Sequence, residues 1–187
     1  DYILLGSILG LILGTVLHEF GHMCSGIYHG AKVFEMGVMI SSFLPGAYVL
    51  LDSSNLKSKI ARIRINSAGV KSNIFLSGVF LLLACIFPSI GSPLLGAAIN
   101  NAFLALLNVT LINGLDGAAI LSDLLGVEDI VSRSKEILHS KMTRRKLSKK
   151  GLNGYAVMAI AVVVRATQIA LPLLYIINGL EILSCFT

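Results

Sequence analysis

Residues His18 to His22 read His-Glu-Phe-Gly-His, an H-E-x-x-H motif within a long apolar run. On a helix, this spacing places both imidazoles on one face, one turn apart, with the carboxylate of Glu19 beside them. Zinc prefers such ligands, and a catalytic zinc site leaves one position for a water molecule. The motif therefore predicts that His18 and His22 bind Zn²⁺ and that Glu19 is catalytic, taking a proton from that water.

In a soluble helix, the same motif can be part of a solvated polar face. Here Glu19 lies near the end of a helix that is long and apolar enough for a bilayer. An ionised side chain near the middle of a bilayer costs about 2.5 to 3.5 kcal/mol on insertion scales, so it needs compensation. This cost favours the metal-binding interpretation.

A zinc site of this kind needs a third protein ligand. His29 is one residue too late for the metzincin spacing, and we expect it at the exit of the helix. Asp116 lies in the sequence Asn-Gly-Leu-Asp-Gly, where Gly114 and Gly117 interrupt an apolar run and allow close backbone approach. Asp116 is therefore the predicted third ligand.

The expected depth of these residues in the membrane agrees with this choice. At the rise of an α-helix, the path from Tyr2 to His18 descends about 24 Å, and the path from Pro93 to Asp116 about 35 Å. If both paths start at the outer face, both end near the inner boundary. His18 and Asp116 are therefore expected at a similar depth.

The composition indicates a membrane protein. Of 187 residues, 55% are apolar and 13% are charged, and the mean hydropathy is +0.83. A bilayer core needs about 20 apolar helical residues, and four stretches meet that length. We therefore predict an all-α polytopic fold with about four transmembrane helices and a β-hairpin or re-entrant segment between the first and second. The expected spans are 2–28, 68–87, 93–112 and 155–177, with the hairpin at 33–51 and a Leu-Asp-Gly turn at 113–117.

The basic residues predict the orientation. Thirteen of the fifteen lie in two loops that follow the first and third spans, which the positive-inside rule assigns to the cytoplasm. We expect a multi-pass protein of the cell membrane, in contact with the lipid bilayer, with its active site near the cytoplasmic side. No compact basic domain is visible, so no nucleic-acid partner is expected. The predicted parts are a protease core at 1–125, a basic cytoplasmic loop at 126–152 and a further transmembrane helix at 153–187. Because Asp1 is not an initiator methionine, upstream residues are expected to be missing.

Small residues form a stripe on the first span. Gly6, Gly10 and Gly14 continue in steps of four to the two motif histidines. Such a small-xxx-small pattern lets another helix approach closely. We predict that this groove seats the helix that carries Asp116.

These motifs resemble the site-2 protease family of intramembrane zinc metalloproteases, which joins H-E-x-x-H in one membrane helix to Leu-Asp-Gly in a later one. The likeness runs from about Gly10 to Leu125. Further family-like pieces stand in the expected order: Leu44-Pro45-Gly46-Ala47-Tyr48-Val49 resembles the Gly-Tyr-Val hairpin, and Ala68-Gly69 followed by Asn73 resembles the A-G-P-x-x-N segment.

The resemblance implies hydrolysis of peptide bonds within or next to the transmembrane segments of membrane-protein or peptide-precursor substrates. It also implies a catalytic role for Asn108, which precedes Asp116 by eight residues as in the family, in contacting the substrate backbone or polarising the scissile carbonyl. An interhelical hydrogen bond remains the alternative for Asn108, because Asn101 shares its helix face. A regulatory membrane partner or an oligomer is compatible with the sequence.

Two other functions stay open at this point. The first is a catalytically inactive protein of the same fold that binds membrane helices. The second is a metal permease, because intramembrane His and Asp residues also mark ion pathways. A permease would spread polar groups along several spans, whereas here they gather at one depth.

Overall fold

The computed structural model describes residues 2–41, 44–53 and 55–184. These residues group into two compact units. The first contains the chain up to Thr110 together with Leu115–Ile120, and the second contains Leu111–Gly114 and the residues from Leu121 onward.

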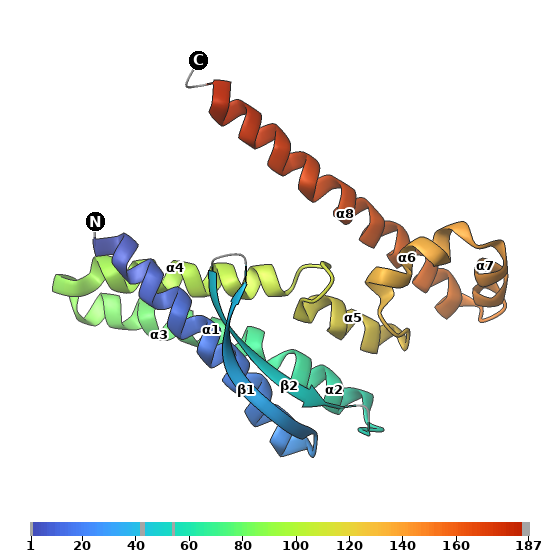
Figure 1. Ribbon diagram of the computed structural model, residues 1–187, viewed down its shortest axis with the longest axis horizontal. Helices are drawn as coiled ribbons and strands as arrows, with labels where there is room; N and C mark the ends of the chain where they lie inside the picture. The colour runs from blue at the N-terminus through green and yellow to red at the C-terminus, as the bar shows by residue number, and fades with distance from the viewer. Residues whose placement is uncertain (1, 42–43, 54, 185–187) are drawn as a thin grey trace. The chain divides into compact units, whose positions relative to one another are not determined.

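Helices dominate both units, as Figure 1 shows. In the first unit, helix α1 is followed by a two-stranded hairpin, two further helices and a short 3-10 turn before α4. Helix α5 begins in the first unit and ends in the second, where three more helices follow. The bounds are α1 Tyr2–His29, β1 Lys32–Ser41, β2 Leu44–Asp52, α2 Lys59–Asn66, α3 Ala68–Ile86, the 3-10 turn Pro88–Ile90, α4 Gly91–Asn108, α5 Asp116–Leu125, α6 Ile130–His139, α7 Lys141–Ser148 and α8 Leu152–Ser184.

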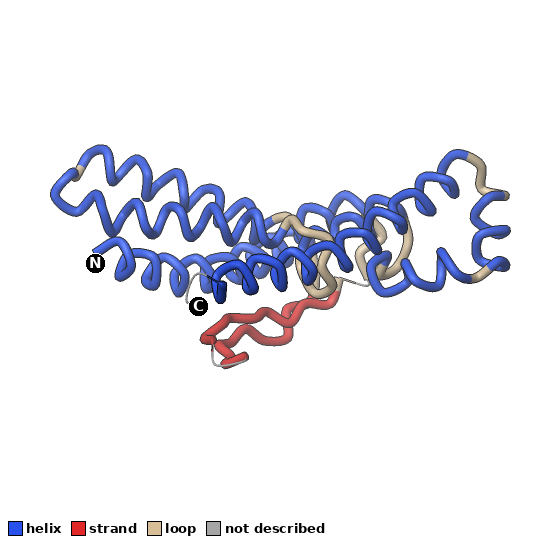
Figure 2. Tube along the Cα trace, turned by 90° about the horizontal axis from the view of Figure 1, so that it is seen from above, coloured by secondary structure: helices blue, strands red, loops and turns tan. Residues whose placement is uncertain are grey.

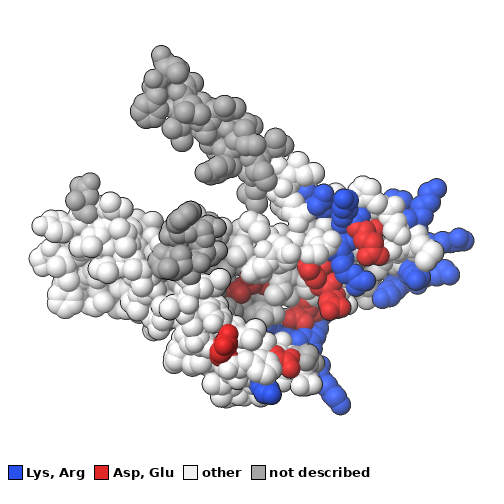
Figure 3. All heavy atoms as spheres, viewed as in Figure 1, with Lys and Arg blue, Asp and Glu red and all other residues white. Residues whose placement is uncertain are grey.

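Among the described residues, four helical segments are long and apolar enough to cross a membrane: Tyr2–His29, Ala68–Ile86, Pro88–Asn108 and Leu152–Ala170. Many large apolar side chains on these helices point outward, such as Phe75, which is 72% exposed. On the face drawn in Figure 3, uncharged residues cover α1, α3 and α4 away from the hairpin. A bilayer solvates such side chains, so they need no protein core. The all-α polytopic prediction is confirmed.

Small residues, in contrast, fill the contact between α1 and α4. A side chain at Gly6 would strike the backbone of Pro93, and one at Gly14 would strike the Oδ1 atom of Asn101. Asn101 is fully buried and donates a hydrogen bond of 3.1 Å to the carbonyl oxygen of Gly10. The glycine stripe therefore seats α4, as close helix packing requires.

The end of α4 differs from the sequence prediction. The third span was expected at 93–112, but its helix ends at Asn108. The apolar residues that follow extend the hydropathy pattern without continuing the helix. A turn with Gly114 at a φ of +88° leads into α5, and a side chain at Gly117 would strike the carbonyl of Val109. The groove therefore seats α4, the helix before Asp116, and not α5, which carries it. The chain turns between Asn108 and Asp116 and does not descend as one continuous helix.

The hairpin between the first and second spans is present. Strands β1 and β2 pair antiparallel, with Lys32 opposite Asp52 and Gly37 opposite Tyr48. Figure 2 shows the hairpin in red beside the helices. Strand β2 packs along α1, where Gly26 makes room for the side chain of Leu51. Residues 42 and 43, inside the predicted range 33–51, lie outside the described part of the chain.

The segment 126–152 is more ordered than the predicted loop. It contains α6 and α7, and the apolar residues Ile130, Val131 and Ile137 of α6 are buried. This amphipathic pattern is difficult to recognise in the sequence, because basic residues dominate the composition of the segment. In the same compact unit, Arg165 of α8 donates a hydrogen bond of 2.7 Å to the side chain of Gln168.

Candidate metal centre

His18 and His22 lie on the buried face of α1, in line with the glycine stripe. Their exposed fractions are 6% and 7%. Both rings project from a helix whose opposite face is apolar and exposed, so the local sequence alone fixes their common direction. The spacing of four residues therefore gives the shared face that the motif predicts.

The structure brings Asp116 to the two histidines. The Nε2 atoms of His18 and His22 lie 3.2 Å apart, and Oδ2 of Asp116 lies 3.3 Å from the first and 3.2 Å from the second. Tetrahedral zinc with bonds of about 2.05 Å separates its ligand atoms by about 3.3 to 3.4 Å. The three atoms form a triangle of the size that such an ion needs, in a group that can hold a metal.

The hydrogen bonds behind the rings fix which nitrogen atoms face this centre. Nδ1 of His22 lies 2.7 Å from the carbonyl oxygen of Ile65, which only accepts, so Nδ1 carries the proton and donates. Nε2 of His22 then directs a lone pair at Oδ2 of Asp116. Among the described residues, that buried oxygen has no hydrogen-bond donor as a partner. Lone pairs converging on one point repel each other, and a cation between them removes the repulsion.

Gly69 leaves the space for an ion. A Cβ atom at this position would press on the Nε2 atoms of both His18 and His22. Gly69 is itself buried in the first turns of α3, which pack against α1. A hydrogen atom at this position therefore keeps the space next to the two ring nitrogens open.

Asp116 reaches the cluster through the turn between α4 and α5. It is the first residue of α5 and lies beyond the candidate spans. Burial raises the pKa of its carboxyl group, but hydrogen bonds and charge from His18 and His22 in their protonated, metal-free form lower it by more, so the net pKa is below the usual value. The carboxylate is thus the form present at neutral pH, as a metal ligand requires.

Glu19 is next to the cluster and is partly buried. The backbone amide of Val49 in β2 lies near its carboxylate. The hairpin therefore touches the residue that the motif singles out as the base. This contact between Val49 and Glu19 was not foreseen, because nothing in the sequence fixes which edge of the hairpin faces α1.

Asn73 is a further residue of the site, known from the sequence only as part of the family-like segment. It is fully buried, and its side-chain amide lies 3.1 Å from Nδ1 of His18. Asn108, in contrast, donates a hydrogen bond of 3.0 Å to Leu104 in its own helix. The structure thus gives Asn108 an intrahelical bond, while Asn101 makes the bond between helices. His29 lies at the end of α1, outside the three-residue cluster.

Taken with the four candidate spans, the cluster defines a polytopic membrane protein with a candidate metal centre between its helices. Residues 6–91 match the model of Peptidase family M50. This match supports the resemblance of the chain's motifs to the site-2 proteases. The matched range contains His18, Glu19 and His22 and ends before Asp116. A comparison with curated proteins found no match.

Proposed function

We propose that this chain is an intramembrane zinc metalloprotease. His18, His22 and Asp116 would hold the ion, and Glu19 would be the general base. The observation that carries this proposal is the triangle of ligand atoms, with edges of 3.2 to 3.3 Å, next to the open space at Gly69. Asn108 keeps the role that the family resemblance implies, contact with the substrate backbone or with the scissile carbonyl.

The chemistry divides between the metal and Glu19. When bound, zinc supplies a Lewis acid that polarises the scissile carbonyl and acidifies a water molecule. The Glu19 carboxylate accepts the proton of the attacking water as the new C–O bond forms. It then donates that proton to the amide nitrogen as the C–N bond breaks. The products are a carboxylic acid and an amine, so no other reactant is needed.

The substrate follows from the location of the site. The cluster lies between apolar helices, near the membrane boundary that the basic loops assign to the cytoplasm. A transmembrane segment hides its carbonyl groups in helical hydrogen bonds and must unwind before it is cut. A strand added to the outer edge of β2 would hold such a segment extended, and Val49 places that edge beside Glu19.

The decisive experiment compares the purified wild-type chain with Glu19→Gln on a panel of single-span substrates in vesicles, with zinc measured in both. We expect the variant to keep its zinc and to lose cleavage by at least about a hundredfold, the scale of a lost general base. Equal cleavage by both proteins would refute the protease assignment. No cleavage by either, with zinc bound, would favour an inactive helix-binding protein of this fold.

A further inference from the structure

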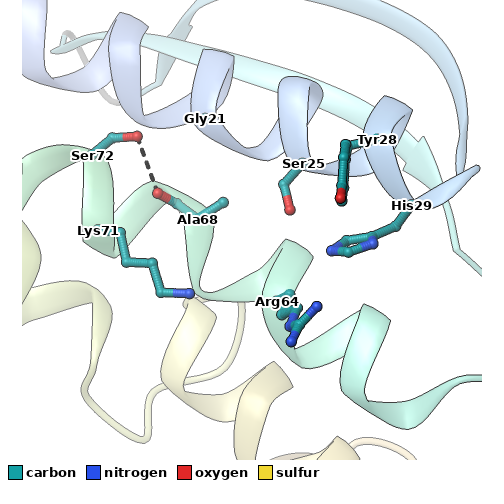
Figure 4. A pocket seen from close by; sticks show the side chains of 8 residues that line it. All are labelled: Gly21, Ser25, Tyr28, His29, Arg64, Ala68, Lys71 and Ser72. Carbon is teal, nitrogen blue, oxygen red and sulfur yellow. Dashed lines mark hydrogen bonds between the residues drawn. The ribbon is translucent and has the colours of Figure 1, made fainter.

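A second pocket lies in the first unit, separate from the His18–His22 cluster. It has a volume of about 400 Å³ and opens between the end of α1, the helix α2 and the first turns of α3. Figure 4 shows Ser25, Tyr28 and His29 projecting from α1 toward Arg64 of α2, while Lys71 extends from α3. The lining residues are Gly21, Ser25, Tyr28, His29, Arg64, Ala68, Lys71 and Ser72.

The charged side chains that line this pocket are both cations. Arg64 and Lys71 are cationic and exposed, and no carboxylate is among the lining residues. Within the described part of the chain, no hydrogen bond or ion pair engages the Arg64 guanidinium or the Lys71 ammonium group. The hydroxyls of Ser25 and Tyr28 add two hydrogen-bond donors. Two unpaired cations with hydroxyl donors form a site for phosphate oxygens.

The pocket also lies where lipid headgroups are found. Its walls are the last turns of one candidate span, Tyr2–His29, and the first turns of the next, Ala68–Ile86. Between them lies α2, a basic helix outside the spans. Lys71 is the fourth residue of its span, where an ammonium group inside hydrocarbon is costly and the side chain reaches for the interface. The pocket is therefore at the boundary between hydrocarbon and water.

We propose that this pocket binds the phosphate-bearing headgroup of an anionic lipid, with Arg64 and Lys71 as the charge partners. The apolar outer surface of the adjoining helices would carry the acyl chains. A bound headgroup would tie the end of α1 to α2 and α3. Arg64 precedes Ile65, whose carbonyl holds His22, and Lys71 follows closely after Gly69. The lipid would therefore stabilise the backbone that supports the candidate metal centre, whether or not the chain cleaves peptides.

The test measures lipid binding to the full chain, purified in a neutral detergent, by native mass spectrometry. The probes are phosphatidylglycerol, phosphatidylcholine with the same acyl chains, and inorganic phosphate. The variant is Arg64→Gln/Lys71→Gln. Its matched control is Arg145→Gln/Lys146→Gln in α7, which removes the same charge from exposed positions that do not line the pocket.

We expect the wild type to retain phosphatidylglycerol in preference to phosphatidylcholine. Each lost cation should weaken this binding by about fivefold, the usual contribution of a basic residue near an anionic surface. The control should bind as the wild type does. The single variant Lys71→Gln, whose ammonium group makes no hydrogen bond or ion pair with the described residues, is measured in parallel and keeps the test valid if the double variant does not fold.

Three results would overturn the proposal. One is equal retention of both lipids, and another is a loss in the α7 control as large as in the pocket variant. The third is displacement of phosphatidylglycerol by millimolar inorganic phosphate, which would indicate a site for a free ion instead of a lipid.

Discussion

Asn73 of α3 and His18 of α1 meet in the core of the first unit, with the amide of Asn73 3.1 Å from Nδ1 of His18. A metal on Nε2 requires a proton on Nδ1, so the partner of Nδ1 must accept. The Oδ1 atom of Asn73 is buried and has no hydrogen-bond partner in the described part of the chain. Rotating the side-chain amide by 180° brings this oxygen to Nδ1 of His18 as the acceptor. Asn73 thus orients His18 for metal binding.

This relationship gives the first prediction. Asn73→Ala should weaken zinc binding by about 10- to 100-fold, the usual cost of losing such a partner. Zinc affinity is measured by competition with a chelator. Asn101→Ala is the control, because Asn101 is equally buried but bonds to Gly10. It should lower thermal stability and leave zinc affinity unchanged. A similar loss of affinity in both variants would mean that Asn73 only supports the fold.

The second prediction concerns the space at Gly69. Gly69→Ala should abolish zinc binding, because the added methyl group would press on both ring nitrogens. Gly78→Ala in the same helix has nothing within 4 Å of its new methyl group and should bind zinc normally. Zinc content of the purified proteins, measured by elemental analysis, decides between them. Full zinc content in Gly69→Ala would place the ion elsewhere.

The sequence predicts some of these features better than others. The shared face of His18 and His22 follows from helical periodicity, which is local. Asp116 could be chosen as a ligand because few acidic residues are present. The turn that brings the chain from α4 to Asp116 could not be predicted, since Val109 and Ile112 are apolar enough to continue the span. Hydropathy measures the preference for lipid and does not detect where a helix ends.

Contacts between distant segments were the least predictable. The proximity of Gly69 to the histidines depends on how α3 packs against α1, and a glycine in an apolar helix is equally compatible with plain helix packing. The bond between Ile65 and His22 uses a backbone carbonyl, which every residue has. Only the tertiary structure determines which backbone carbonyl points at the His22 ring.

The third prediction tests the packing of α1 against α4. Gly14→Leu should abolish zinc retention, because its side chain would displace Asn101 and force α4, and with it the turn that leads to Asp116, away from α1. Cys24→Leu places the same side chain at an exposed position of the same helix and should keep its zinc. Unaltered zinc in Gly14→Leu would show that the cluster does not depend on this contact.

The last prediction separates substrate holding from metal binding. Val49 directs its N–H away from β1, toward Glu19, so Ala47, two residues earlier, directs its N–H to the same outer edge. Ala47→Pro removes this donor without breaking the bonds between β1 and β2. Cleavage should slow by about two- to tenfold, the value of one backbone hydrogen bond, while zinc content stays constant. Ala47→Val keeps the N–H and should cleave normally. If proline at position 47 leaves the cleavage rate unchanged, the substrate does not pair with β2 there, and another surface must hold it extended beside Glu19.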